Sequence, residues 1–127
     1  MELTVVEESG LNLVEGQPGQ AFMSSVRDTD LVLEACFSSG TSCALLYAAN
    51  LPPAFFDLSS GDAGTILQKL RNYRIRLAVV CPPGSVDFSS RFGEMVTEER
   101  RGPHFGLFET REAAMEWIRE WADADAD

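Results

Sequence analysis

Cys81 and His104 are the residues of this chain that come nearest to a nucleophile and its base. Cys81 closes a short apolar run, and His104, the single histidine, stands just before another. Nucleophiles in α/β enzymes occur at the carboxyl ends of central strands, and a cysteine needs a base or a positive field to become a thiolate. The two residues form a candidate catalytic couple if their apolar runs are neighbouring strands. The alternative is a buried, inert thiol, the commoner state of a free cysteine.

A small polar loop at 57–61 is the second candidate site. It precedes a helical pattern, and the amides of a helix N-terminus attract anions while Ser and Gly allow a ligand to approach closely. The candidate ligand or partner contacts are Asp57, Ser59, Ser60 and Gly61. The alternative is purely local. Ser59 with Asp62 fits a capping box, and Asp57 can accept hydrogen bonds from nearby backbone amides.

Asn72, Arg74 and Arg76 are candidate anion contacts. The two arginines alternate ahead of a buried strand, so both could point the same way and clamp a carboxylate or phosphate. The alternative is a helix C-terminus that carries favourable positive charge, with Asn72 in the turn. These residues precede the strand, whereas ligands of open α/β sheets bind beyond the carboxyl ends. That geometry favours the alternative.

Metal and cofactor sites lack their usual patterns. No His/Cys spacing fits zinc, and the glycine patterns of a P-loop or dinucleotide site are absent. We therefore expect no metal and no cofactor. The glutamates of the predicted helices have the spacing of solvated faces rather than of a buried acid–base pair.

The elements that must position these residues alternate along the chain. Strand-like runs lie at 3–6, 11–14, 43–48, 77–81 and 105–108. The first two flank Gly10 and indicate a paired hairpin or two edge strands, while 43–48 and 77–81 are continuously apolar, as in strands covered on both faces. One helix is expected from about Asp28 to a glycine cap at Gly40, with Leu31, Val32, Ala35 and Cys36 together on one face.

Three further helices complete the pattern. The second follows Ser59, with a buried stripe of Ala63, Ile66, Leu67, Leu70 and Tyr73. The third carries Phe88, Phe92, Met95 and Val96. The last begins after Thr110 as N-cap and buries Ala113, Ala114, Trp117, Ile118 and Trp121. Alternation of strand and helix predicts one α/β domain over 1–121, with a mixed, mostly parallel sheet of about five strands and about four helices. The acidic segment 122–127 is expected to be disordered.

Composition narrows the classes of function. The 127 residues carry a net charge of −10 and are 45% apolar, as in an ordinary globular chain. Such acidity repels nucleic-acid backbones, so we expect no nucleic-acid partner. No apolar run approaches a membrane span, and the N-terminus lacks a signal peptide, so we expect a cytoplasmic protein without membrane attachment. The three cysteines, Cys36, Cys43 and Cys81, are expected to be reduced.

Several short motifs resemble a family known only as domain of unknown function 4180. They are Phe-Phe-Asp-Leu at 55–58, Ala63-Gly64, Ile-Leu-Gln-Lys at 66–69, Asn-Tyr-Arg at 72–74, and Ala113 with its helix. The resemblance covers about the last two thirds of the chain. It implies membership of a family but no activity.

The same region is more distantly similar to STAS domains, which occur in anti-sigma-factor antagonists and in the tails of anion transporters. There a strand ends in an Asp-Ser-Ser/Ala-Gly loop, and in the antagonists the serine after the aspartate is phosphorylated. Here Leu58 separates Asp57 from Ser59. Alignment on Ser-Ser-Gly makes Ser59 the counterpart of the switch, while alignment on the aspartate leaves none. The resemblance implies a STAS-like fold and possible phosphorylation at Ser59 or Ser60.

Three hypotheses of function follow. The leading one is a non-enzymatic, STAS-like regulatory module that presents the 55–61 loop and adjacent helix faces to a protein partner or a small anionic ligand. The second is a small enzyme or accessory biosynthetic protein whose pocket, at the carboxyl edge of the sheet, is lined by Tyr47, Phe55, Phe56 and Cys81. The third is a structural homodimer that associates through an apolar patch on the last helix or the first strand.

Overall fold

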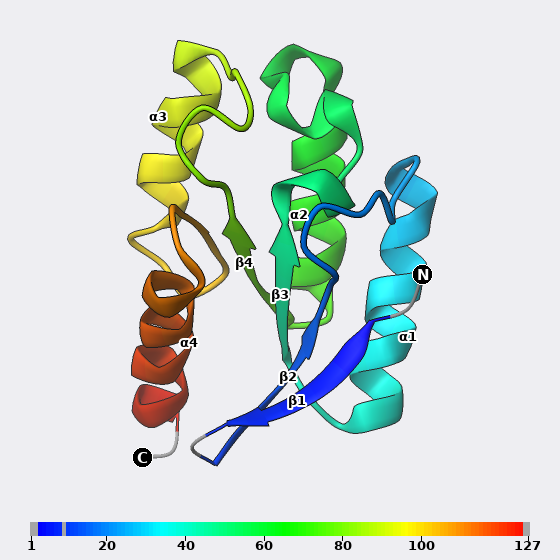
Figure 1. Ribbon diagram of the computed structural model, residues 1–127, viewed down its shortest axis with the longest axis vertical. Helices are drawn as coiled ribbons and strands as arrows, with labels where there is room; N and C mark the ends of the chain where they lie inside the picture. The colour runs from blue at the N-terminus through cyan, green and yellow to red at the C-terminus, as the bar shows by residue number, and fades with distance from the viewer. Residues whose placement is uncertain (1–2, 9, 126–127) are drawn as a thin grey trace.

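The computed structural model describes residues 3–8 and 10–125, in which an open five-stranded sheet has helices on both faces (Figure 1). The strands are β1 (Thr4–Glu8), β2 (Leu11–Glu15), β3 (Cys43–Tyr47), β4 (Arg76–Val80) and β5 (Phe105–Phe108). They lie in sequence order. β1 and β2 form an antiparallel hairpin, and β2 to β5 are parallel. The expected single α/β domain with a mostly parallel sheet of five strands and four helices is confirmed.

Three of the four helices cover one face of this sheet. The helices are α1 (Thr29–Ser39), α2 (Asp62–Asn72), α3 (Ser90–Glu99) and α4 (Arg111–Asp125). The first three connect successive parallel strands, and because crossovers of one hand put their helices on one side, α1, α2 and α3 share a core. α4 follows the last strand and packs alone on the opposite face.

The central strands are apolar throughout because both of their faces are covered. In β3, Ala44 and Leu46 pack toward α1, α2 and α3, while Cys43 and Leu45 pack toward α4. Side chains of a strand point alternately to its two faces, so a strand between two helical layers has no solvent-facing set. The interpretation of these runs as doubly covered strands is confirmed.

Two of the predicted helix caps are confirmed and one is wrong. Gly40 caps α1 in the left-handed conformation, with φ of 68°, and the Thr110 side chain accepts a hydrogen bond from the Ala113 amide at the start of α4. The capping box expected at Ser59 is wrong. α2 begins only at Asp62, after Gly61 with φ of 81°, and Ser59 lies in a preceding 3-10 turn. The left-handed glycine separates that turn from the helix.

Three residues lie elsewhere than the sequence predicts. Tyr73 is 54% exposed because α2 ends at Asn72, so helical spacing no longer directs its side chain inward. It contacts exposed Phe37, with ring centroids 5.5 Å apart. Leu31, expected on the inner face of α1, is exposed. Phe88 precedes α3 rather than lying within it.

The last helix packs largely as expected. Ala114, Trp117 and Ile118 are buried against the sheet, so core packing accounts for Trp117. Helix α4 continues to Asp125, and the end of the expected tail, 126–127, lies outside the described residues. All three cysteines are free and buried. No helix in the described chain is long and apolar enough to cross a membrane.

Gly106 of β5 provides a test of this packing. A Cβ there would lie 2.6 Å from two ring atoms of Phe108, which is itself held by Trp117. We expect Gly106→Ala to lower the free energy of unfolding by about 1–3 kcal/mol, because neither ring can move away without disturbing the α4 core. Urea denaturation measures the change. Gly93→Ala is the control. Its Cβ would meet only an ordinary contact at 3.7 Å, and alanine should stabilise α3 slightly. Equal midpoints for Gly106→Ala and wild type would contradict this packing.

Candidate functional site

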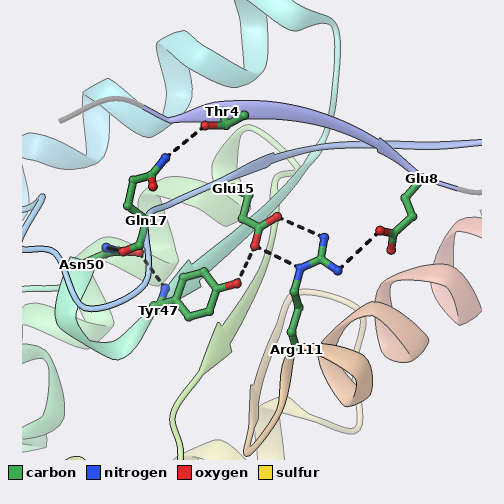
Figure 2. Close-up of polar contacts among 7 residues, drawn as sticks. All are labelled: Thr4, Glu8, Glu15, Gln17, Tyr47, Asn50 and Arg111. Atoms are coloured by element: carbon green, nitrogen blue, oxygen red, sulfur yellow. Dashed lines mark hydrogen bonds and ion pairs between the residues drawn. The ribbon is translucent and has the colours of Figure 1, made fainter.

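Arg111, the first residue of α4, joins the carboxyl ends of β2 and β3 (Figure 2). Its Nε and Nη2 donate to the two oxygens of Glu15 at 3.0 and 3.1 Å, a bidentate ion pair. Tyr47 donates its hydroxyl hydrogen to the same carboxylate at 2.5 Å. Glu8 of β1 lies 3.5 Å from Arg111 Nη1. The four side chains, which we call the Arg111 cluster, tie α4 to three strands.

Burial and hydrogen bonding set the protonation states in the Arg111 cluster. The pKa of Tyr47 rises to about 12, first because burial disfavours the phenolate and second because its proton is held by the Glu15 carboxylate. The pKa of Arg111 is also raised, chiefly by its hydrogen bonds to Glu15. Tyr47 is therefore a neutral donor at physiological pH and not a base. This cluster is suited to fixing elements in place.

Asn50 organises the loop beside the Arg111 cluster (Figure 2). It is fully buried, and its side-chain nitrogen donates to the backbone oxygens of Gln17 and Gln20 at 2.8 and 2.6 Å. Its side-chain oxygen accepts from the Tyr47 amide at 2.7 Å. A buried amide is stable only when its groups are satisfied in this way. Asn50 thus holds the segment after β2 against the end of β3.

A cavity of about 680 Å³ opens beyond the carboxyl ends of β4 and β5. One wall is the loop that links β4 to α3 (Figure 1). The second wall is the junction of β5 and α4, and Arg100 at the end of α3 forms a third. Its lining consists of Cys81, Pro82, Pro83, Gly84, Val86, Asp87, Phe88, Arg100, Leu107, Phe108, Glu109, Thr110 and Ala113. We call it the β4–β5 cavity. This is the edge at which open parallel sheets bind ligands.

The β4–β5 cavity has a rigid floor and an aromatic side. The Cys81 amide donates to the Phe108 oxygen at 2.7 Å, so the sheet ladder continues beneath it. The Arg100 guanidinium carbon lies 4.7 Å from the centroid of the Phe108 ring, within the range of a cation–π contact. The cavity therefore has continuous sheet backbone at its base and a positively charged group on its aromatic side.

Pro82 and Pro83 begin a tight turn in the wall of the β4–β5 cavity. The Ser85 amide donates to the Pro82 oxygen at 3.0 Å, and Gly84 has φ of 80°. Proline followed by a glycine of positive φ is the requirement of a type II turn. The Ser85 hydroxyl also donates to the Pro82 oxygen at 2.6 Å and lies 3.5 Å from the Cys81 sulfur. The two prolines thus shape the wall beside Cys81.

A second cavity of about 410 Å³ lies beyond β3. The segment after β3 supplies one side, including Phe56 and Asp57, and the loop after β4 supplies the other, through Ser85, Val86 and Asp87. Val86 and Asp87 line both cavities. A single loop therefore separates the two cavities, and its position determines the shape of both.

A model of the family described as Domain of unknown function (DUF4180) matches residues 8–118. The chain belongs to the DUF4180 family. The match includes every residue of the Arg111 cluster and every residue that lines the β4–β5 cavity. Among curated proteins and among solved structures, the searches found no match. The resemblance to STAS domains therefore stays a prediction.

In this DUF4180 chain, Cys81 and His104 do not meet. Cys81 follows the carboxyl end of β4, whereas the His104 oxygen accepts from the Leu77 amide at the opposite end of the same parallel pair. Five residues of strand separate the two levels, roughly 16 Å at 3.3 Å per residue. The couple expected from sequence is not assembled, because both residues flank parallel strands but at opposite ends.

The pocket expected at the carboxyl edge is divided differently. Cys81 lines the β4–β5 cavity and Phe56 lines the second one. Phe55 is fully buried, packed edge-to-face on Phe92 and Phe105 at centroid distances of 5.8 and 6.1 Å. Tyr47 belongs to the Arg111 cluster. The four residues thus share one edge of the sheet but not one pocket.

The 57–61 loop is held by its own hydrogen bonds. Asp57 accepts from the Ser59 amide at 3.1 Å and from the Ser59 hydroxyl at 2.6 Å. The Ser60 hydroxyl donates to the Ala54 oxygen and accepts from the Asp62 amide. Both serines are exposed, so their phosphorylation stays a prediction. Asp57, Ser59 and Ser60 are thus used locally, as the alternative interpretation expected for Asp57.

Asn72, Arg74 and Arg76 lie at the amino end of β4, opposite both cavities. Asn72 accepts a hydrogen bond from Gln68 at 2.8 Å. Arg74 is exposed and has φ of 58°, as the residue that turns the chain from α2 into β4. The positive charge of Arg76 opposes the rise in the pKa of Cys43 that burial causes. The structure does not bring the three together with the 57–61 loop.

Sequence reasoning missed Glu15, Arg111 and Arg100. Arg111 carried a signal, because a cation in the first turn of a helix opposes the helix dipole and requires a nearby carboxylate. Arg100 carried none, since positive charge is favourable at a helix end. Asp87 and Glu109 could have been found as the acidic residues that follow β4 and β5.

Tyrosine ionisation tests the Arg111 cluster. The chain has two tyrosines, Tyr47 and Tyr73. We expect a tyrosinate absorbance component near pH 12 that Tyr47→Phe removes and Tyr73→Phe retains. The folded pKa of Tyr47 lies above its usual value of about 10. Its contribution to stability is therefore complete below pH 10 and is lost as pH rises toward 12.

Circular dichroism followed in the same titration separates ionisation from unfolding. Wild type should lose stability more steeply between pH 10 and 12 than Tyr47→Phe does. Identical titration curves for wild type and Tyr47→Phe would contradict the buried hydrogen bond to Glu15.

Proposed function

We propose that this DUF4180 protein is a non-enzymatic module that binds a small ligand in the β4–β5 cavity. The observation that carries the proposal is the cavity itself, about 680 Å³ and bounded by three separate segments at the carboxyl ends of parallel strands. Its volume lies in the range of small-molecule sites, and its lining combines apolar side chains with polar and charged groups.

The chemistry beside Cys81 favours binding over turnover. The thiol is buried, and its polar neighbour is the Ser85 hydroxyl, which is a poor base. A cysteine nucleophile needs a base or field that stabilises the thiolate, and His104 lies at the other end of the sheet. Turnover that depends on Cys81 would overturn the non-enzymatic part of the proposal.

A regulatory role follows from the loop shared by the two cavities. Val86 and Asp87 face the ligand cavity on one side and the cavity beside Asp57 on the other. A ligand that repositions this loop would alter the surface near the exposed 57–61 loop, where a protein partner could respond. Ligand binding in the cavity would then control the binding of a protein partner at the 57–61 loop, as in the STAS-like interaction module expected from the sequence.

Filling the cavity tests the proposal. The probe is 8-anilinonaphthalene-1-sulfonate, an aromatic anion whose fluorescence rises in apolar sites. Ala113 lines the cavity from α4, and Ala113→Phe should weaken probe binding at least about tenfold, equivalent to about 1.4 kcal/mol. Glu120→Phe, on the same helix but exposed, is the matched control and should bind as wild type. Circular dichroism is used to check that both variants fold.

The competing sites have their own controls. Phe37→Ser and Tyr73→Ser remove the exposed aromatic pair on α1 and α2. Wild-type binding that survives these changes but not Ala113→Phe supports the cavity. Binding that is absent, or that is lost with the aromatic pair instead, contradicts the proposal.

A further inference from the structure

Three charged side chains from three segments surround the β4–β5 cavity. Asp87 comes from the loop after β4, Arg100 from the end of α3, and Glu109 from the residue after β5. Within the described chain, none of these side chains has a hydrogen bond or ion pair. The contact of Arg100 is with the face of Phe108. Both signs of charge are therefore available at one cavity.

Arg100 differs from the arginines that contact a carboxylate. Arg111 is bound by Glu15, and Arg71 donates to Glu99 at 2.6 Å. Arg100 lines the same cavity as two carboxylates yet pairs with neither. Instead its guanidinium is placed by stacking on an aromatic ring, which leaves its edge of N–H donors free for a planar anion. Such a fork matches the bidentate geometry of a carboxylate, as it does that of a phosphate.

Several apolar side chains of the lining are incompletely covered. Phe88 is 42% exposed and packs against Phe92, with the two rings tilted by 55° and their centroids 5.1 Å apart. Val86 and Leu107 are partly buried beside it. An apolar or aromatic group between these side chains would remove their surface from water, which is the main non-directional source of affinity.

Charge complementarity restricts the chemical class of the ligand further. A purely anionic ligand would match Arg100 but would approach two carboxylates, and a purely cationic one would match Asp87 and Glu109 but approach Arg100. Like charges at close range oppose binding. Resting on the proposed function, we infer that the β4–β5 cavity takes a small zwitterion with an apolar body, the class represented by a free aromatic amino acid. Its carboxylate binds Arg100, its ammonium binds Asp87 or Glu109, and its ring lies against Phe88 and Leu107.

Three related compounds separate the contributions. L-Phenylalanine carries both charges, 3-phenylpropionate lacks the ammonium and 2-phenylethylamine lacks the carboxylate. Isothermal titration calorimetry should give a dissociation constant for phenylalanine at least about tenfold below that of either analogue. Equal or weaker binding of phenylalanine would overturn the inference.

Variants assign each ligand group to its protein partner. Arg100→Gln should remove the advantage of phenylalanine over phenylethylamine and leave its advantage over phenylpropionate. The double variant Asp87→Asn, Glu109→Asn should do the reverse. Arg101→Gln, an exposed neighbour outside the cavity, is the matched control and should bind as wild type. A loss in the control equal to that in Arg100→Gln would contradict the assignment.

The outcomes distinguish this inference from the proposed function. Probe binding that is sensitive to Ala113→Phe, together with no preference for the zwitterion, would overturn the ligand class and leave the binding site intact. Failure of both the fluorescent probe and the three compounds to bind would overturn the proposed function itself.

Discussion

The bidentate pair between Arg111 and Glu15 is the contact on which the carboxyl edge of the sheet depends. Helix α4 alone covers the second face, and its first residue is fastened to β2, with Tyr47 of β3 sharing the same carboxylate. An exposed pair such as Lys69–Asp30 contributes only about 0–1 kcal/mol. The Glu15 carboxylate is better shielded and accepts three hydrogen bonds, so loss of either partner leaves a poorly solvated charge and costs more.

The position of α4 determines the β4–β5 cavity. Thr110 caps the helix and Ala113 lines the cavity. Arg111, whose ion pair with Glu15 holds the helix, therefore lies between two lining residues. The opposite wall is fixed by the proline-rich turn after β4, whose glycine requires the left-handed conformation. Two locally rigid junctions thus face each other across the ends of β4 and β5. A preformed site of this kind binds with little ordering cost.

Sequence reasoning predicted the fold better than the site, for physical reasons. The doubly buried strands, the glycine cap of α1 and the Thr110 cap depend on periodicity and local hydrogen bonds, which neighbouring residues reveal. The cavity depends on which strand ends lie side by side, and that register brings Asp87, Arg100 and Glu109 together from separate segments. That Cys81 and His104 do not pair was not predictable for the same reason. Two strands can be neighbours while the two residues lie at opposite ends of them. At Ser59, the left-handed Gly61 delayed the helix beyond the expected cap.

Amide chemical-shift mapping by NMR is the most direct test of a ligand site in the β4–β5 cavity. In a titration of the isotopically labelled protein with 8-anilinonaphthalene-1-sulfonate, we expect saturable shifts concentrated at 81–88, Arg100 and 107–113. Smaller shifts are expected at the 57–61 loop, because one loop forms a wall of both cavities. Shifts centred instead on Phe37 and Tyr73, or no saturable shifts at all, would contradict a ligand site at the carboxyl ends of β4 and β5.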